Sequence, residues 1–130
     1  MLIEALRSAS GSAPPRGLLG GLADERLAAA LRQIHAHPTR PWTVLQLAQE
    51  AALSRSSFFE RFRRAVGVAP MEYLLHWRMA LAKDLLRRGE GGVAEVAARV
   101  GYGSASTFSV AFARHVGRSP STYARDQTAA

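Results

Sequence analysis

The side chains that could support covalent or metal-dependent chemistry are few in this 130-residue sequence, and they are poorly spaced for it. There is no cysteine, which excludes a thiolate nucleophile and a Cys-based zinc site. His35 and His37 are two residues apart and would point to different faces of a helix, while His76 and His115 are isolated in the sequence. The serines within residues 54–57 lack a recognisable His-Asp arrangement and are typical of helix caps. We therefore expect no catalytic residue, no metal site, no cofactor and no enzymatic activity.

The charge of the chain indicates non-covalent chemistry with a polyanion instead. Its formal net charge is +7, from 17 basic and 10 acidic residues, and every basic residue except Lys83 is arginine. Such a balance favours nucleic acid ahead of an anionic membrane surface. The arginine excess fits two readings equally: a GC-rich genome, or a need for bidentate contacts to phosphate and guanine.

The segments that must position these cations form an internal repeat. The segment FRRAVGVAPMEY, residues 62–73, is echoed by FARHVGRSPSTY, residues 112–123. The same offset of 50 residues joins Phe58 to Phe108, and upstream the offset becomes 49, as between Val44 and Val93. Two copies are too few for a solenoid, which needs about three repeats to bury a continuous core. The repeat therefore predicts a duplicated small module.

Residues that begin and end helices predict the same two-helix arrangement in each copy. Thr43 and Ser54 are N-cap residues for two short helices, and Gly67 is a suitable left-handed stop for the second. Two short helices joined by about three residues form a helix-turn-helix. The first spans about residues 43–66, and the second copy spans about residues 93–116. Asp24 caps an earlier helix, and a last short helix starts at residue 120. Strand-like alternation is missing from the sequence, so we expect an all-α fold of about seven helices.

A long central helix over about residues 70–88 joins the two modules. Its apolar residues form two neighbouring stripes that cover more than half of the circumference: Leu74, Trp77, Leu81 and Leu85, and Met71, Leu75, Met79, Ala82 and Leu86. Such a broad surface predicts a helix that packs between two bodies. Arg78 lies within it and needs a partner, for which Glu50, Asp84 and Glu95 are candidates. Tyr73 and Tyr123, at matched positions, are expected to be core residues.

Residues 1–22 have a different composition. MLIEALRS could be a short helix, and the following Ser, Gly and Pro residues are typical of a flexible linker. This segment is a possible remnant of an N-terminal regulatory domain. The sequence contains neither an export signal nor a long apolar run, so we expect no membrane contact and a cytoplasmic location.

Over residues 24–125 the chain resembles the DNA-binding domain of the AraC/XylS family of bacterial transcription regulators. The resemblance rests on LAQEAALSRSSFFERF, GVAPMEYLLHWRMALAKDLL, VAARVGYGSASTF and VGRSPSTY. It implies a DNA-binding domain over residues 23–126, in which two recognition helices enter successive major grooves of a promoter or operator.

The resemblance also implies a role and partners. We expect an activator that contacts RNA polymerase, with no small-molecule ligand on this part and a monomeric state. The sequence leaves open whether the chain comes from a longer regulator or is naturally short. A nonspecific DNA binder and a helical protein-interaction module stay open as alternative functions.

The first recognition helix offers the stronger set of candidate contacts. With Phe58 and Phe62 inward, the outward residues are Ser56, Phe59, Glu60 and Arg63, and the resemblance places the first three against bases. Arg55 and Arg63 are candidates for phosphate contacts, which set register but carry no sequence information. Glu60 could accept a hydrogen bond from cytosine N4, or pair with Arg63 or Arg64 on the surface.

The second recognition helix is weakly charged. It departs from the family at Val110 and Ala113, where basic residues are common. We expect thymine-methyl and hydroxyl contacts there, with flanking phosphate support from Arg114 and Arg118 and less electrostatic affinity than in the first copy. The candidate contact residues of this copy are Ser104, Ala105, Ser106, Thr107, Val110 and Arg114.

Overall fold

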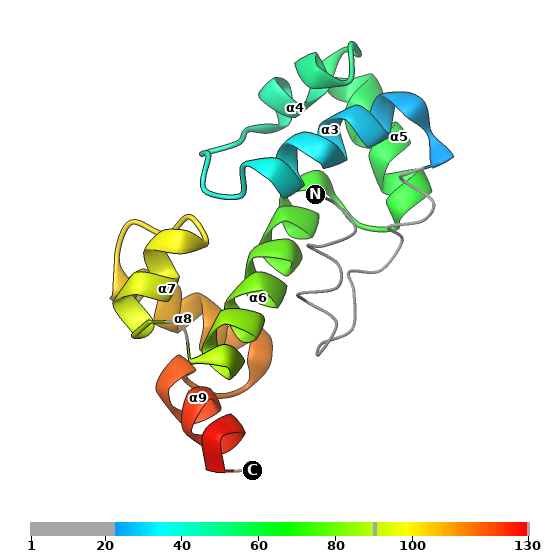
Figure 1. Ribbon diagram of the computed structural model, residues 1–130. Helices are drawn as coiled ribbons and strands as arrows, with labels where there is room; N and C mark the ends of the chain where they lie inside the picture. The colour runs from blue at the N-terminus through cyan, green and yellow to red at the C-terminus, as the bar shows by residue number, and fades with distance from the viewer. Residues whose placement is uncertain (1–22, 90, 130) are drawn as a thin grey trace.

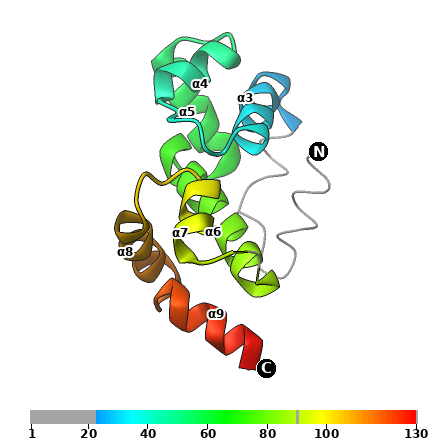
Figure 2. The same cartoon turned by 60° about the vertical axis from the view of Figure 1, so that its left-hand side comes forward.

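The computed structural model describes residues 23–89 and 91–129, and within these ranges it contains helices and no strand. Figures 1 and 2 show α6 as a rod that joins a body of α3, α4 and α5 to a body of α7, α8 and α9. The predicted all-α fold with seven helices is confirmed. The helices are α3 (Glu25–Ala36), α4 (Val44–Glu50), α5 (Arg55–Val66), α6 (Pro70–Arg88), α7 (Val93–Arg99), α8 (Ala105–Val116) and α9 (Pro120–Ala129).

The helix ends lie where polar caps and glycines predicted them. Thr43 forms a capping box with Gln46. The backbone nitrogen of Gln46 donates to Thr43 Oγ1 at 3.1 Å, and the backbone nitrogen of Thr43 donates to Gln46 Oε1 at 3.0 Å. Ser54 accepts from the backbone nitrogen three residues on, at 3.2 Å. Gly67 and Gly117 end α5 and α8 in the left-handed region, with φ of 96° and 95°. Each cap is worth about 1 kcal/mol.

Two separate hydrophobic cores confirm that α6 packs on two bodies, and they divide the helix along its length and not by stripe. Leu74 and Trp77 belong to the core of α3, α4 and α5, whereas Leu85, on the same stripe, belongs to the core of α7 and α8. Leu81 packs against both cores. The helix is therefore shared along its length, with its first half in one body and its second half in the other.

The repeat is preserved as a trio of rings in each body. Phe58 and Phe62 have ring centroids 5.5 Å apart, and Tyr73 meets Phe62 edge-on at 5.8 Å. In the second body the matching distances, Phe108 to Phe112 to Tyr123, are 5.6 and 5.5 Å. Tyr73 is fully buried and Tyr123 is partly buried against the second core. Both tyrosines are packing residues, as predicted.

The expected pairing of Arg78 with a carboxylate is wrong. Arg78 donates to backbone carbonyls, from Nε to Pro38 O at 2.8 Å and from Nη2 to Arg40 O at 3.0 Å. Among the described residues none of the three candidate carboxylates pairs with it, and Asp84 is bridged instead to Arg87 and Arg88 at 3.1 and 2.9 Å. Sequence patterns mark charged side chains but not carbonyl acceptors, so this partner was missed.

Two histidines that are isolated in the sequence meet in the structure. His76 on α6 and His115 on α8 have ring centroids 5.0 Å apart, because the second body folds back onto α6. His76 Nε2 also lies 3.9 Å from Glu72 Oε2, one turn earlier.

Within the described residues, no group of three or more His, Cys, Asp or Glu side chains could hold a metal ion. Separately, no helix in the described part of the chain is long and apolar enough to cross a membrane.

A buried histidine should make the first body sensitive to acid. His35 stacks at 4.1 Å on Trp77, and its Nε2 lies 2.6 Å from the Tyr73 hydroxyl. Its Nδ1 is buried without a partner in the described structure. Burial lowers the pKa of His35 from 6.5 to about 4. The unfolded chain therefore takes up this proton before the folded chain does.

We expect the free energy of unfolding to fall by up to about 3 kcal/mol as pH drops from about 6.5 to about 4, since the shift spans more than two pH units. The stabilisation is fully present above pH 6.5 and is lost towards pH 4. Urea unfolding across this range, compared with a His35→Leu variant, checks the prediction. The variant should show a flatter pH dependence, and equal slopes would assign the acid sensitivity to other groups.

Candidate nucleic-acid interface

Helix α5 is held by one face and presents the other to solvent. Two of its three phenylalanines, Phe58 and Phe62, have no exposed surface, and they fix the rotation of the helix. The candidate contact residues on the opposite side are all exposed, and Phe59 has 36% of its surface accessible. These exposed candidates are Arg55, Ser56, Phe59, Glu60 and Arg63.

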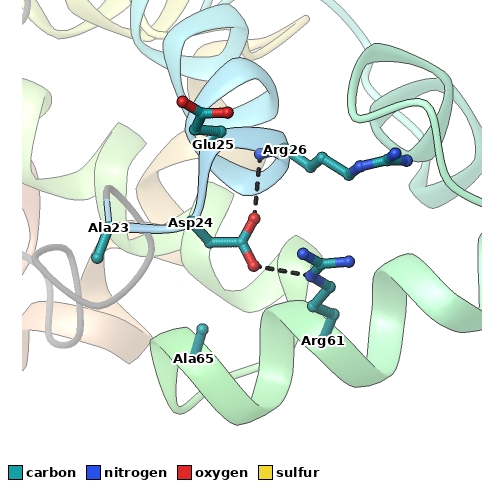
Figure 3. A pocket seen from close by; sticks show the side chains of 6 residues that line it. All are labelled: Ala23, Asp24, Glu25, Arg26, Arg61 and Ala65. Carbon is teal, nitrogen blue, oxygen red and sulfur yellow. Dashed lines mark hydrogen bonds and ion pairs between the residues drawn. The ribbon is translucent and has the colours of Figure 1, made fainter.

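The charged side chains of α5 divide into two groups. Arg61 donates from Nε to Asp24 Oδ2 at 2.7 Å and ties the helix to α3 (Figure 3). Partial burial acts to raise the pKa of Asp24, but the hydrogen bonds from Arg61 and the Leu27 and Arg26 amides lower it overall. This aspartate therefore stays ionised as both a cap and a bridge. Because Arg61 is occupied, it is not a candidate for the exposed face.

The other arginines of α5 have no competing ion-pair partner among the residues that the structure describes. In the described part of the chain, Arg55, Arg63 and Arg64 make no ion pair, and neither does Glu60. The alternative in which Glu60 pairs with a neighbouring arginine is therefore not found. A shallow hollow lies beside these groups at the end of the helix, lined by Glu60, Arg63, Arg64 and Gly67. The face carries unpaired cations with one carboxylate among them, which suits both phosphate and a base amine.

Helix α8 presents hydroxyl and methyl groups in the matching place. Ser104 Oγ accepts from the Thr107 amide at 3.1 Å and donates to Thr107 Oγ1 at 2.9 Å, so the first turn carries a linked pair of hydroxyls. Val110 is 59% exposed and places its methyl groups on this face. Ala105 is only half-buried, while Ser106 and Arg114 are exposed. With Arg114 alone against Arg55, Arg63 and Arg64 of α5, this face has the weaker charge that the sequence predicted.

The two turns that aim α5 and α8 each contain a residue with positive φ at the matching position. Ala52 has φ 57° and Gly101, 49 residues later, has φ 101°. After each of them the next amide returns to the preceding helix, from Leu53 to Ala48 O at 3.0 Å and from Tyr102 to Ala97 O at 2.9 Å. A left-handed residue in each turn fixes the angle between the two helices of the module.

A further anchor was not visible in the sequence. Arg26 of α3 donates from Nη1 to Ala52 O at 2.8 Å, so the first turn is held from outside its own module. Its acceptor is a backbone carbonyl 26 residues away, and residue types carry no signal for such a contact.

Comparison with known proteins agrees with this geometry. The chain matches the helix-turn-helix domain family over residues 47–126. A putative AraC-like transcription regulator of Streptomyces lividans is 46% identical and covers 98% of this chain, which spans 43% of that protein. The transcriptional regulator AlkR of Acinetobacter baylyi is 39% identical over 84% of the chain and 36% of its own length. The chain thus spans less than half the length of the curated relatives it matches.

One solved structure is of a related domain with DNA bound. The DNA-binding domain of AdpA, a global transcriptional factor, was crystallised in complex with a target DNA. It is 33% identical to this chain, with a TM-score of 0.74 over 78% of the chain and 92% of that domain. The fold of this chain is therefore similar to that of a domain solved in complex with a target DNA.

Proposed function

The chain belongs to the AraC-like family of helix-turn-helix transcription regulators, and from that premise we propose that it recognises double-stranded DNA with two recognition helices. In this proposal α5 and α8 occupy successive major grooves on one face of the duplex, about 34 Å apart. One chain then contacts two half-sites, as a dimer of proteins with one recognition helix per subunit does. Because its two recognition helices differ, the chain can bind an asymmetric site.

The observation that carries this proposal is the matched pair of modules on α6. Each module has the same aromatic trio, a left-handed residue in its turn and a recognition-type helix with an exposed face. A protein-interaction module has no need of two equally built turns. The AdpA domain bound to its target DNA supports the same use of the fold.

Within the proposal the residues of α5 take different roles. Arg55 and Arg63 contact phosphates and set the register, while Ser56, Phe59 and Glu60 face the bases. Glu60 repels phosphate but can accept from cytosine N4, so it contributes to specificity and not to affinity.

The second helix works with less charge. Ser106 and Thr107 offer hydroxyls to base edges, Ala105 and Val110 offer methyl groups to thymine, and Arg114 reaches a flanking phosphate. Ser104 acts through the cap that orients Thr107.

The same premise supports a role beyond DNA binding. We propose that the chain serves in a bacterial transcription regulator, as an activator that also contacts RNA polymerase, and that it works in the cytoplasm as a monomeric module. Residues 1–22, expected to be a short helix and linker, lie outside the described residues.

Selection from a random duplex library at two salt concentrations tests the proposal. We expect enrichment of two short blocks about ten base pairs apart, retained at the higher salt better than bulk DNA. Recovery of a single block would mean that α8 has lost its role. Binding that collapses with salt and enriches nothing would replace the specific reader with a nonspecific DNA binder, and undetectable binding at low salt would favour a protein partner.

A further inference from the structure

The two modules are joined by more than α6. Arg78, near the middle of this helix, reaches into the loop between α3 and α4 and donates to Pro38 O and Arg40 O. Figure 1 shows this loop on the side of α6 that faces α7. Both acceptors belong to the first body, so α6 is braced against that body at a point beyond the first core.

The same guanidinium also meets the second body. Its central carbon lies 5.9 Å from the ring centroid of Tyr102, a cation–π distance. Tyr102 follows the left-handed residue of the second turn and packs edge-on against Phe108 of α8 at 5.5 Å. A single side chain therefore touches both the first body's loop and the turn that aims the second recognition helix.

Gly101 brings the two backbones together at this point. A Cβ atom placed on Gly101 would lie 2.8 Å from Pro38 O, 3.0 Å from Thr39 Cα and 3.1 Å from Arg78 Nε. Two of these atoms are backbone, which cannot move aside cheaply. The turn of the second module therefore needs glycine for close approach as well as for its φ of 101°.

We propose that Arg78 and Gly101 lock the two modules in one relative orientation and thereby set the number of base pairs between the two DNA blocks that the chain reads. This inference rests on the proposed function. Among the described residues the two cores share only the packing of Leu81 on α6, so bending or twisting of this helix is a freedom that would change the relative orientation of the modules. The second contact removes that freedom.

Rigidity has a measurable consequence on DNA. Inserting one base pair between the blocks rotates the second block by about 35° around the duplex axis, given about 10 base pairs per turn. A locked pair of modules cannot follow this rotation, whereas loosely joined modules can. Arg78 is thus a positioning residue that touches no DNA itself.

The test compares wild-type protein with Arg78→Met and Gly101→Ala on duplexes that carry the two selected blocks at every spacing within three base pairs of the natural one. Gly117→Ala is the matched control, because Gly117 has φ 95° and open space around its Cβ position. It carries the same backbone strain as Gly101→Ala without the clash. Arg78→Met keeps the apolar stem and removes the donors.

We expect wild-type protein and Gly117→Ala to prefer one spacing by about tenfold or more over its neighbours, which is about 1.4 kcal/mol. Arg78→Met and Gly101→Ala should bind all spacings within about threefold of one another, with unchanged affinity for a single block. Spacing profiles of unchanged shape, merely lowered in affinity, would overturn the proposal.

A second readout needs no DNA. Because the chain has no cysteine, spin labels can be placed at Gln49→Cys on α4 and Ala98→Cys on α7, both exposed positions. The distance distribution between them should be narrow in the otherwise wild-type chain and broader in the two lock variants. Equal widths would overturn the lock. If the wild-type chain selects no pair of blocks, the proposed function fails, and this measurement still decides whether Arg78 fixes the modules.

Discussion

Replacing Arg55 and Arg63 together by alanine should weaken binding to every duplex by about a hundredfold or more, because hydrogen bonds to charged groups are each worth about 1.5–3 kcal/mol. The loss should be uniform across sequences, and the slope of log affinity against log salt should fall by about 2, one for each phosphate contact. Fluorescence anisotropy titrations on selected and scrambled duplexes at several salt concentrations measure both quantities.

The matched control removes two cations from elsewhere. Arg32 on α3 and Arg125 on α9 are both exposed and lie outside the proposed interface. Their double alanine variant has the same net charge as the test variant, and it should lose less than about tenfold. If both variants lose the same affinity, overall charge and not the face of α5 governs binding, and the assigned phosphate contacts are wrong.

Phe62→Ala should destabilise the protein by about 3–5 kcal/mol, the cost of emptying a fully buried aromatic site. Phe62 belongs to the first core alone, so the damage should concentrate in α3, α4 and α5. Phe112→Ala is the equivalent lesion in the second core and should concentrate in α7 and α8. Urea unfolding gives the total loss, and amide hydrogen exchange gives its location.

Leu45→Ala is the control for these two variants. Leu45 is 52% exposed on α4, so Leu45→Ala should change the free energy of unfolding by less than about 0.5 kcal/mol. If Phe62→Ala lowers protection equally in both bodies, the protein unfolds as one unit. The two cores would then not be energetically separate.

Local signals in the sequence predicted the elements of the fold well. Ser54 and Ser104 begin recognition helices because their hydroxyls satisfy a free amide of the first turn, a preference that acts within four residues. Gly67 and Gly117 end these helices for an equally local reason. Phe58 and Phe62, one turn apart, then determine which faces are left for a ligand.

Contacts between distant segments were not predictable in the same way. Arg78 finds carbonyl oxygens about 40 residues away, and any residue type provides such an acceptor. The meeting of His76 with His115 depends on how the second body folds against α6. The stripes of α6 predicted two bodies, but only the packing showed that they divide the helix along its length. These missed contacts fix the relation between modules, whereas the predicted ones build each module.

The proposed division of labour between α5 and α8 is tested most directly by repeating the library selection with one variant in each helix. Glu60→Gln alters the face of α5, and Thr107→Ala alters the face of α8. The account predicts that each variant changes the preferred bases in one block and leaves the other block as in the wild type, with a cost of about 1–3 kcal/mol at the affected position. If both variants changed the same block, or neither changed any base preference, the two-headed reading of DNA would be contradicted.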